Sequence, residues 1–132
     1  MERLSLKSAA REDFLDITGE LRELVRMRGW ISGALALFCP HTTGALTVNE
    51  GADPDVERDV LARLRTLAPR EGDYRHAEGN SDAHVKTSLL GPSLLVLVQD
   101  GTLMLGTWQK VFFCEFDGPR RRELWAQWLP GA

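Results

Sequence analysis

The sequence of 132 residues has few cysteines, few histidines and no long apolar segment. Cys39 and Cys114 are the only thiols, and each lies in an apolar strand-like run, which predicts two buried, reduced cysteines in a cytoplasmic protein. No run of 18 apolar residues occurs, which argues against a membrane-spanning helix. The N-terminal residues lack the apolar core of a signal peptide. We therefore expect a cytoplasmic protein with no membrane partner.

The chain also lacks an excess of positive charge. Its 16 Lys and Arg residues face 19 Asp and Glu residues, a net charge of −3. This balance gives no general attraction to nucleic acid, so we expect no nucleic-acid partner. The one basic run, 120–122, is short, and we interpret it as a solvated strand end and not as a phosphate clamp. The 43% apolar and 27% charged residues are typical of a globular protein, and the length predicts a single domain over residues 1–132.

Two segments have the pattern of main helices. Apolar side chains recur at helical spacing over residues 18–28, where Thr18 is the expected cap and Gly29 the expected left-handed stop. Asp53 and Pro54 predict the start of the second helix, because Asp caps well and Pro fits the first helical position.

The remaining segments read mainly as strands. A shorter helix is expected over residues 83–90, with Ser81 or Asp82 as its cap. The continuous apolar run 30–38 predicts a central strand. Gln99–Thr102 predicts a hairpin turn. Because the element order is not a regular βαβ alternation, the predicted class is α+β with a mostly antiparallel sheet. The predicted strands cover residues 3–8, 13–17, 30–38, 45–49, 94–98, 103–105, 111–116 and 122–129.

All three histidines lie among polar residues. His41 falls in Cys39–Gly44, and His76 and His84 fall in Tyr74–Lys86. Imidazole is the side chain that most readily carries protons or binds metals near neutral pH, so we predict that these histidines serve catalysis. Three imidazoles with an open fourth position would also hold a catalytic divalent metal such as Zn²⁺. The alternative for each ring is a structural hydrogen bond to the backbone.

Other polar residues near these segments are candidates for binding a substrate, and each has a structural alternative. The Thr pair after His41 offers hydroxyls to an anion or forms a turn, and the Asn-Glu pair ends a strand as a ligand group or a helix-entry loop. Asp82 and Lys86 line an anion pocket or form an i,i+4 ion pair. Trp108 stacks on a ring or packs in a core or subunit interface. The candidate substrate-binding residues are Thr42, Thr43, Asn49, Glu50, Asn80, Asp82, Lys86, Trp108 and Gln109.

Read together and in order, several motifs resemble those of the YjbQ-like family, also called the secondary thiamine-phosphate synthase family. The similarity extends from about residue 14 to residue 129, and the family histidines fall on His41, His76 and His84. The motifs that carry it are Pro40–Glu50, Asp53–Val56, His76–Lys86, Leu105–Gln109 and Cys114–Pro119.

The resemblance implies a compact α+β domain with a β-sandwich-like core, assembled as a homotrimer. It also implies a weak thiamine-phosphate synthase activity, which joins hydroxymethylpyrimidine diphosphate to a thiazole phosphate and releases pyrophosphate. Mg²⁺ or cationic side chains would stabilise the departing pyrophosphate. Two alternatives stay open from the residues alone: a metal-dependent hydrolase with a histidine-bound ion, and a non-enzymatic, anion-binding trimeric protein.

Overall fold

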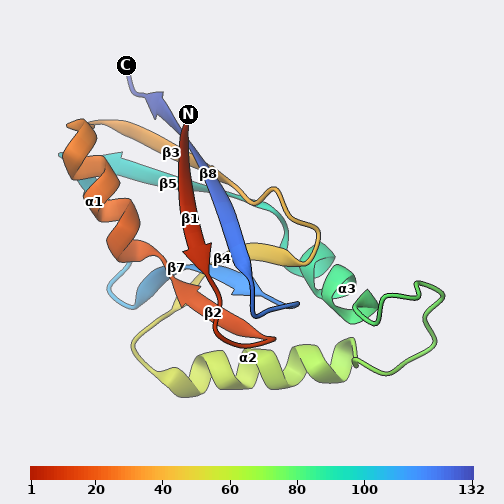
Figure 1. Ribbon diagram of the computed structural model, residues 1–132. Coiled ribbons are helices and arrows are strands. Elements are labelled where there is room, and N and C mark those ends of the chain that lie inside the picture. The colour runs from red at the N-terminus through yellow and green to blue at the C-terminus, as the bar shows by residue number, and fades with distance from the viewer.

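The computed structural model describes all 132 residues as one α+β domain (Figure 1). Three helices accompany eight strands, so the expected short third helix takes its place beside the two main ones. The helices are α1 (Thr18–Arg28), α2 (Pro54–Leu67) and α3 (Ser81–Leu90). The strands are β1 (Glu2–Lys7), β2 (Asp13–Asp16), β3 (Gly33–Phe38), β4 (Gly44–Glu50), β5 (Ser93–Gln99), β6 (Thr102–Leu103), β7 (Gln109–Glu115) and β8 (Arg121–Pro130).

The strands form two antiparallel sheets. The larger sheet has the order β1-β8-β3-β5-β6, and the smaller one has the order β2-β7-β4. β3 is central, as its apolar sequence predicts, because it pairs with both β5 and β8. β1 lies at the edge, as its alternating sequence predicts. The expected α+β class with an antiparallel, sandwich-like core is therefore confirmed.

Two apolar clusters hold three layers together. The first lies between the sheets and joins Leu35 and Val96 of the larger sheet to Phe113 of the smaller one, with Leu21 of α1. The second lies on the other face of the smaller sheet, against α2 and α3, and includes Leu61. Figure 1 shows the same arrangement, with α2 and α3 on the side of the smaller sheet. None of the three helices is long and apolar enough to cross a membrane.

Local signals account for most element ends. The Asp53 side chain accepts a hydrogen bond from the backbone N–H of Asp55 at 2.9 Å, which confirms the cap of α2. Gly29 has φ 65° and ends α1 in the left-handed conformation, as expected. Thr18 is not the cap of α1; its hydroxyl instead accepts a hydrogen bond from Val111 N at 2.9 Å and ties the helix to β7.

No helix covers the outer face of the larger sheet. Along β5 the side chains alternate, so that Val96 and Val98 are buried whereas Leu95 and Leu97 are 62% and 57% exposed. Phe38 at the end of β3 is 45% exposed on the same face. This uncovered apolar face is unusual for a chain that acts alone in water.

Candidate functional site

A polar pocket of about 340 Å³ lies beside the chain that leaves β3 and the start of α3. None of the side chains that line it is hydrophobic. Segments far apart in the sequence meet here: the β3–β4 connection, the start of α3, and the β7–β8 connection. Its lining residues are Pro40, His41, Thr42, Thr43, Glu78, Asn80, His84, Asp117, Arg120 and Arg122.

His41 is held by the backbone of β8. Pro40 has no N–H to continue the ladder between β3 and β8, and the His41 ring takes its place: Nε2 lies 2.9 Å from N and 3.1 Å from O of Glu123. Burial, and then the charge of Arg122, lower the pKa of His41, which favours a neutral ring. With Nε2 accepting the Glu123 N–H, Nδ1 is the ring nitrogen left for a ligand. The structural alternative for His41 therefore holds for one of its two nitrogens.

The other two histidines lie side by side. The ring of His84, on α3, lines the pocket, and the ring of His76 contacts it edge to face with centroids 5.3 Å apart. His76 itself is exposed and does not line the pocket, and its Nε2 lies 3.7 Å from a carboxylate oxygen of Glu78. The structure thus brings His41 and His84 to one pocket and leaves His76 at its margin.

Within a single chain the three histidines do not gather around one point as a three-histidine metal site requires. No group of three or more His, Cys, Asp or Glu side chains in the chain is placed to hold a metal ion. One nitrogen of His41 is already engaged by the backbone of Glu123, which leaves only Nδ1 of that ring for a ligand. The donor set of a single chain does not fit a three-histidine centre.

Arginines that we interpreted as a solvated strand end instead belong to the pocket. Arg122 is buried, with 5% of its surface exposed, and that interpretation is wrong for this residue. Its Nε donates to Glu115 Oε1 at 2.8 Å, and its Nη2 donates to Thr43 Oγ1 at 2.8 Å and also pairs with Glu115. Burial alone would raise the pKa of Glu115, but the Arg122 guanidinium and the Ser8 hydroxyl lower it below its ordinary value. The pair holds Arg122 rigidly at the wall of the pocket.

Arg120 and Asn80 are positioned by Asp117. Arg120 donates from Nε to the Asp117 carbonyl at 2.8 Å and from Nη2 to its carboxylate at 3.1 Å. Asn80 donates from Nδ2 to the same carboxylate at 2.8 Å. Sequence reasoning missed both arginines, although the turn Asp117-Gly118-Pro119 next to a basic run was a usable signal.

The comparisons with known proteins agree with this architecture. Residues 2–131 match the family described as UPF0047 protein YjbQ-like. The chain belongs to that family. It is 47% identical to UPF0047 protein YugU of Bacillus subtilis over 92% of this chain and 93% of the relative. It is 42% identical to UPF0047 protein MJ1081 of Methanocaldococcus jannaschii over 95% of this chain and 91% of the relative.

Solved structures of the family share the fold. An uncharacterized conserved protein of the YjbQ/UPF0047 family from Clostridium acetobutylicum superimposes with a TM-score of 0.95 at 46% identity, covering 98% of this chain and 100% of that one. A conserved hypothetical protein from Thermus thermophilus superimposes with a TM-score of 0.92 at 48% identity, with the same coverage. These names state a family and no activity, so the comparisons establish kinship and fold.

Asp82 and Lys86 lie outside the residues that line the pocket of this YjbQ-like chain. Lys86 Nζ lies 2.8 Å from Asp82 and 2.8 Å from Glu12, and Arg11 bridges both oxygens of Asp82. Asp82 is 0% and Lys86 1% exposed. The i,i+4 ion pair, which was the structural alternative, is what the structure contains, and it ties α3 to the β1–β2 connection and, through Arg65, to α2.

A second group of candidates gathers at the other end of β4. β4 has seven residues, which at ~3.3 Å per residue places its two ends about 20 Å apart. Glu50 pairs with Gln109 across the sheet at the end remote from His41. This group consists of Asn49, Glu50, Trp108 and Gln109. Three of these side chains stabilise local turns by accepting backbone hydrogen bonds: Glu50 from Ala52 N at 2.6 Å, Asn49 from Glu50 N, and Gln109 from Gly106 N. Trp108, 64% exposed, is the exception.

Because Asp82 is buried and ion-paired, we expect the free energy of unfolding to fall at acid pH. Burial alone would raise the pKa of Asp82, but hydrogen bonds from Arg11 and Lys86 lower it to about 2. A lowered folded-state pKa means that the stabilisation is present above the unfolded pKa of ~3.9 and is lost as the pH falls toward about 2. We expect a loss on the order of 2 kcal/mol over that window, measured by urea unfolding at several pH values. Asp82→Asn should show a smaller loss over the same window, and equal losses in both proteins would contradict the assignment.

Proposed function

We propose that the polar pocket binds a small phosphorylated substrate and that the chain has a weak thiamine-phosphate synthase activity. The reaction joins hydroxymethylpyrimidine diphosphate to a thiazole phosphate and releases pyrophosphate. The observation that supports it is the convergence of Arg120, Arg122, His84 and the Thr42 hydroxyl on one pocket without apolar lining. Such a set of donors suits phosphate oxygens better than an apolar ligand.

The pocket residues have distinct roles in this reaction. The bond between the hydroxymethyl carbon and the diphosphate oxygen breaks, the electron pair leaves with pyrophosphate, and the thiazole nitrogen forms the new bond to carbon. Arg122, held by Glu115, and Arg120, held by Asp117, are fixed donors toward the charge that grows on the leaving group. The neutral His41 ring can donate a hydrogen bond from Nδ1 to the leaving group, and the His84 ring is the group placed to exchange a proton with it.

A direct assay tests the proposal. Purified protein given both substrates should form thiamine phosphate and pyrophosphate in equal amounts, detected by chromatography and by a coupled pyrophosphate assay. Boiled protein and each substrate alone serve as controls. No product at high protein concentration, together with stabilisation of the fold by inorganic phosphate or pyrophosphate, would replace the synthase with a non-enzymatic, anion-binding role. The possible Mg²⁺ or Zn²⁺ cofactor stays a prediction, as does the cytoplasmic location.

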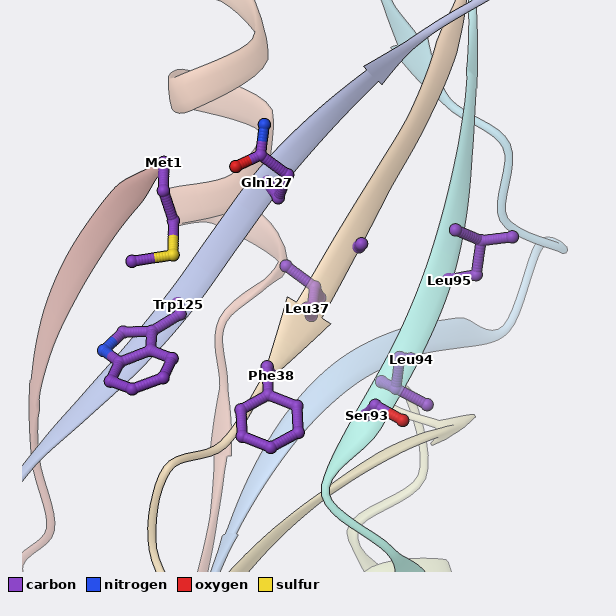
Figure 2. A pocket seen from close by; sticks show the side chains of 9 residues that line it. Met1, Leu37, Phe38, Ser93, Leu94, Leu95, Trp125 and Gln127 are labelled. Carbon is purple, nitrogen blue, oxygen red and sulfur yellow. The ribbon is translucent and has the colours of Figure 1, made fainter.

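We also propose that the chain assembles as a homotrimer through the outer face of the larger sheet. An apolar pocket of about 380 Å³ lies on this face. Figure 2 shows Trp125 and Phe38 near each other there, with Leu95 and Met1 at the sides. No Asp, Glu, Lys or Arg lines it. A second copy of the chain suits the face because its apolar side chains extend along β5, β3 and β8, with the Arg3–Glu123 ion pair at the β1 side, as in permanent subunit interfaces with a polar rim.

A further inference from the structure

The polar pocket lacks one component that the proposed reaction requires. Two heteroaromatic rings have to be oriented, and flat apolar surfaces orient rings by stacking. None of the residues that line the pocket is hydrophobic. A single chain therefore offers the phosphate-binding half of a site, with the imidazoles of His41 and His84 but no large apolar aromatic surface for a ring.

The chain does carry an exposed aromatic surface that could bind a ring, but this surface lies far from the polar pocket. Trp108 precedes β7 and is 64% exposed, although Trp is a costly residue to leave in water. Its carbonyl accepts a hydrogen bond from Gly51 N, which places it at the end of β4 opposite to the pocket. About 20 Å of strand separates it from His41, so one ligand cannot touch both in the same chain.

The exposed apolar side chains of the larger sheet run from one end of β3 to the other, with Leu95 between the two ends. Phe38 pairs in register with Trp125 at the end nearest to the polar pocket. Leu97 and Leu129 flank Ala34 at the other end, where Met104 also hydrogen-bonds back to Leu97. A closed ring of three copies uses a heterologous interface, in which one patch of a copy meets a different patch of the next. A continuous apolar face that reaches both ends lets the pocket end of one copy meet the opposite end of the next.

We infer that the site is shared between copies: Trp108 of one copy forms the ring-binding wall of the polar pocket of the next. This inference rests on the proposed function, because the need for a ring surface comes from the proposed substrates. It places Trp108 of a second copy at the pocket. It also gives a role to the exposure of Trp108, which the single chain does not explain.

Cross-linking tests the arrangement without any need for activity. Thr42→Cys and Trp108→Cys chains are produced together and treated with a short bis-maleimide, while native Cys39 and Cys114 stay buried. We expect a covalent dimer from the mixture and none from either variant alone. Arg63→Cys on α2, paired with Thr42→Cys, is the matched control and should not link. Monomeric protein by light scattering, or a trimer in which Thr42→Cys and Trp108→Cys fail to link, overturns the inference.

Subunit mixing then tests the function of the shared site. His84→Ala and Trp108→Ala should each be inactive as pure proteins. Co-expressed at equal levels, they should regain about a quarter of the wild-type activity, because that share of the pockets combines an intact His84 with an intact Trp108. If both residues acted within one chain, no mixed pocket would be active. Cross-linking without synthase activity in the wild type would reject the proposed reaction and keep the shared pocket.

Discussion

Lys86→Met is expected to lower the free energy of unfolding by about 3–5 kcal/mol. Lys86 is 1% exposed and neutralises two carboxylates at once, those of Asp82 and Glu12. Methionine has a similar length and shape, so the variant mainly removes the charge. Asp82 then keeps Arg11 and Glu12 keeps Arg65, but each loses one of its two cationic partners. A buried carboxylate with too few partners is costly, and this cost destabilises the folded state.

Urea denaturation followed by circular dichroism measures this effect. The midpoint should fall while the slope stays the same, since the surface exposed on unfolding is unchanged. Lys7→Met is the matched control, because Lys7 is exposed at the end of β1 and should change stability by no more than about 0.5 kcal/mol. Equal midpoints for the two variants would mean that the buried ion cluster contributes little to the fold.

His84→Ala is expected to reduce the proposed synthase activity by about 10²- to 10⁴-fold. Its ring lines the pocket from α3, and neither of its nitrogens has a protein hydrogen-bond partner, in contrast to His41. The ring is therefore free to exchange a proton with a leaving group. Steady-state rates of pyrophosphate release at saturating substrate measure the loss.

His76→Ala is the matched control for this prediction. His76 touches the edge of the His84 ring but does not line the pocket, so its loss should cost less than about 10-fold. Both variants should keep the melting temperature of the parent, because neither ring is fully buried. A His84→Ala protein that turns over normally would remove this residue from the site even if the activity itself were real.

Sequence reasoning identified the site segments better than the site members. The Cys39–Gly44 and Tyr74–Lys86 segments do meet, since His41, Asn80 and His84 line one pocket. Asp82 and Lys86 were candidates on the same grounds, yet they face the opposite way into an ion cluster. On a helix, residues two apart point in different directions, so His84 and Lys86 could not both face the pocket. Which of them did was decided by Glu12, a residue 74 positions from Lys86 in the chain.

Arg122 is a pocket residue that local sequence could not identify. A short basic run at a strand end is solvated in most proteins, and the turn before it does not tell which of its arginines is buried. Its burial follows from the carboxylate of Glu115 and the hydroxyl of Thr43, the second of which lies 79 residues away. Only the register of β8 against its neighbours brings these groups together.

The amino-acid order by itself determined the α+β class, the Asp53 cap, the Gly29 stop and the central position of β3, because each depends on side chains within a few residues of one another or on a run of apolar ones. The tertiary structure decided that His41 binds the backbone of Glu123, that Lys86 is buried, and that Trp108 lies a strand length away from the histidines. Those outcomes depend on strand register and on burial between distant segments, and neither quantity is encoded in local spacing.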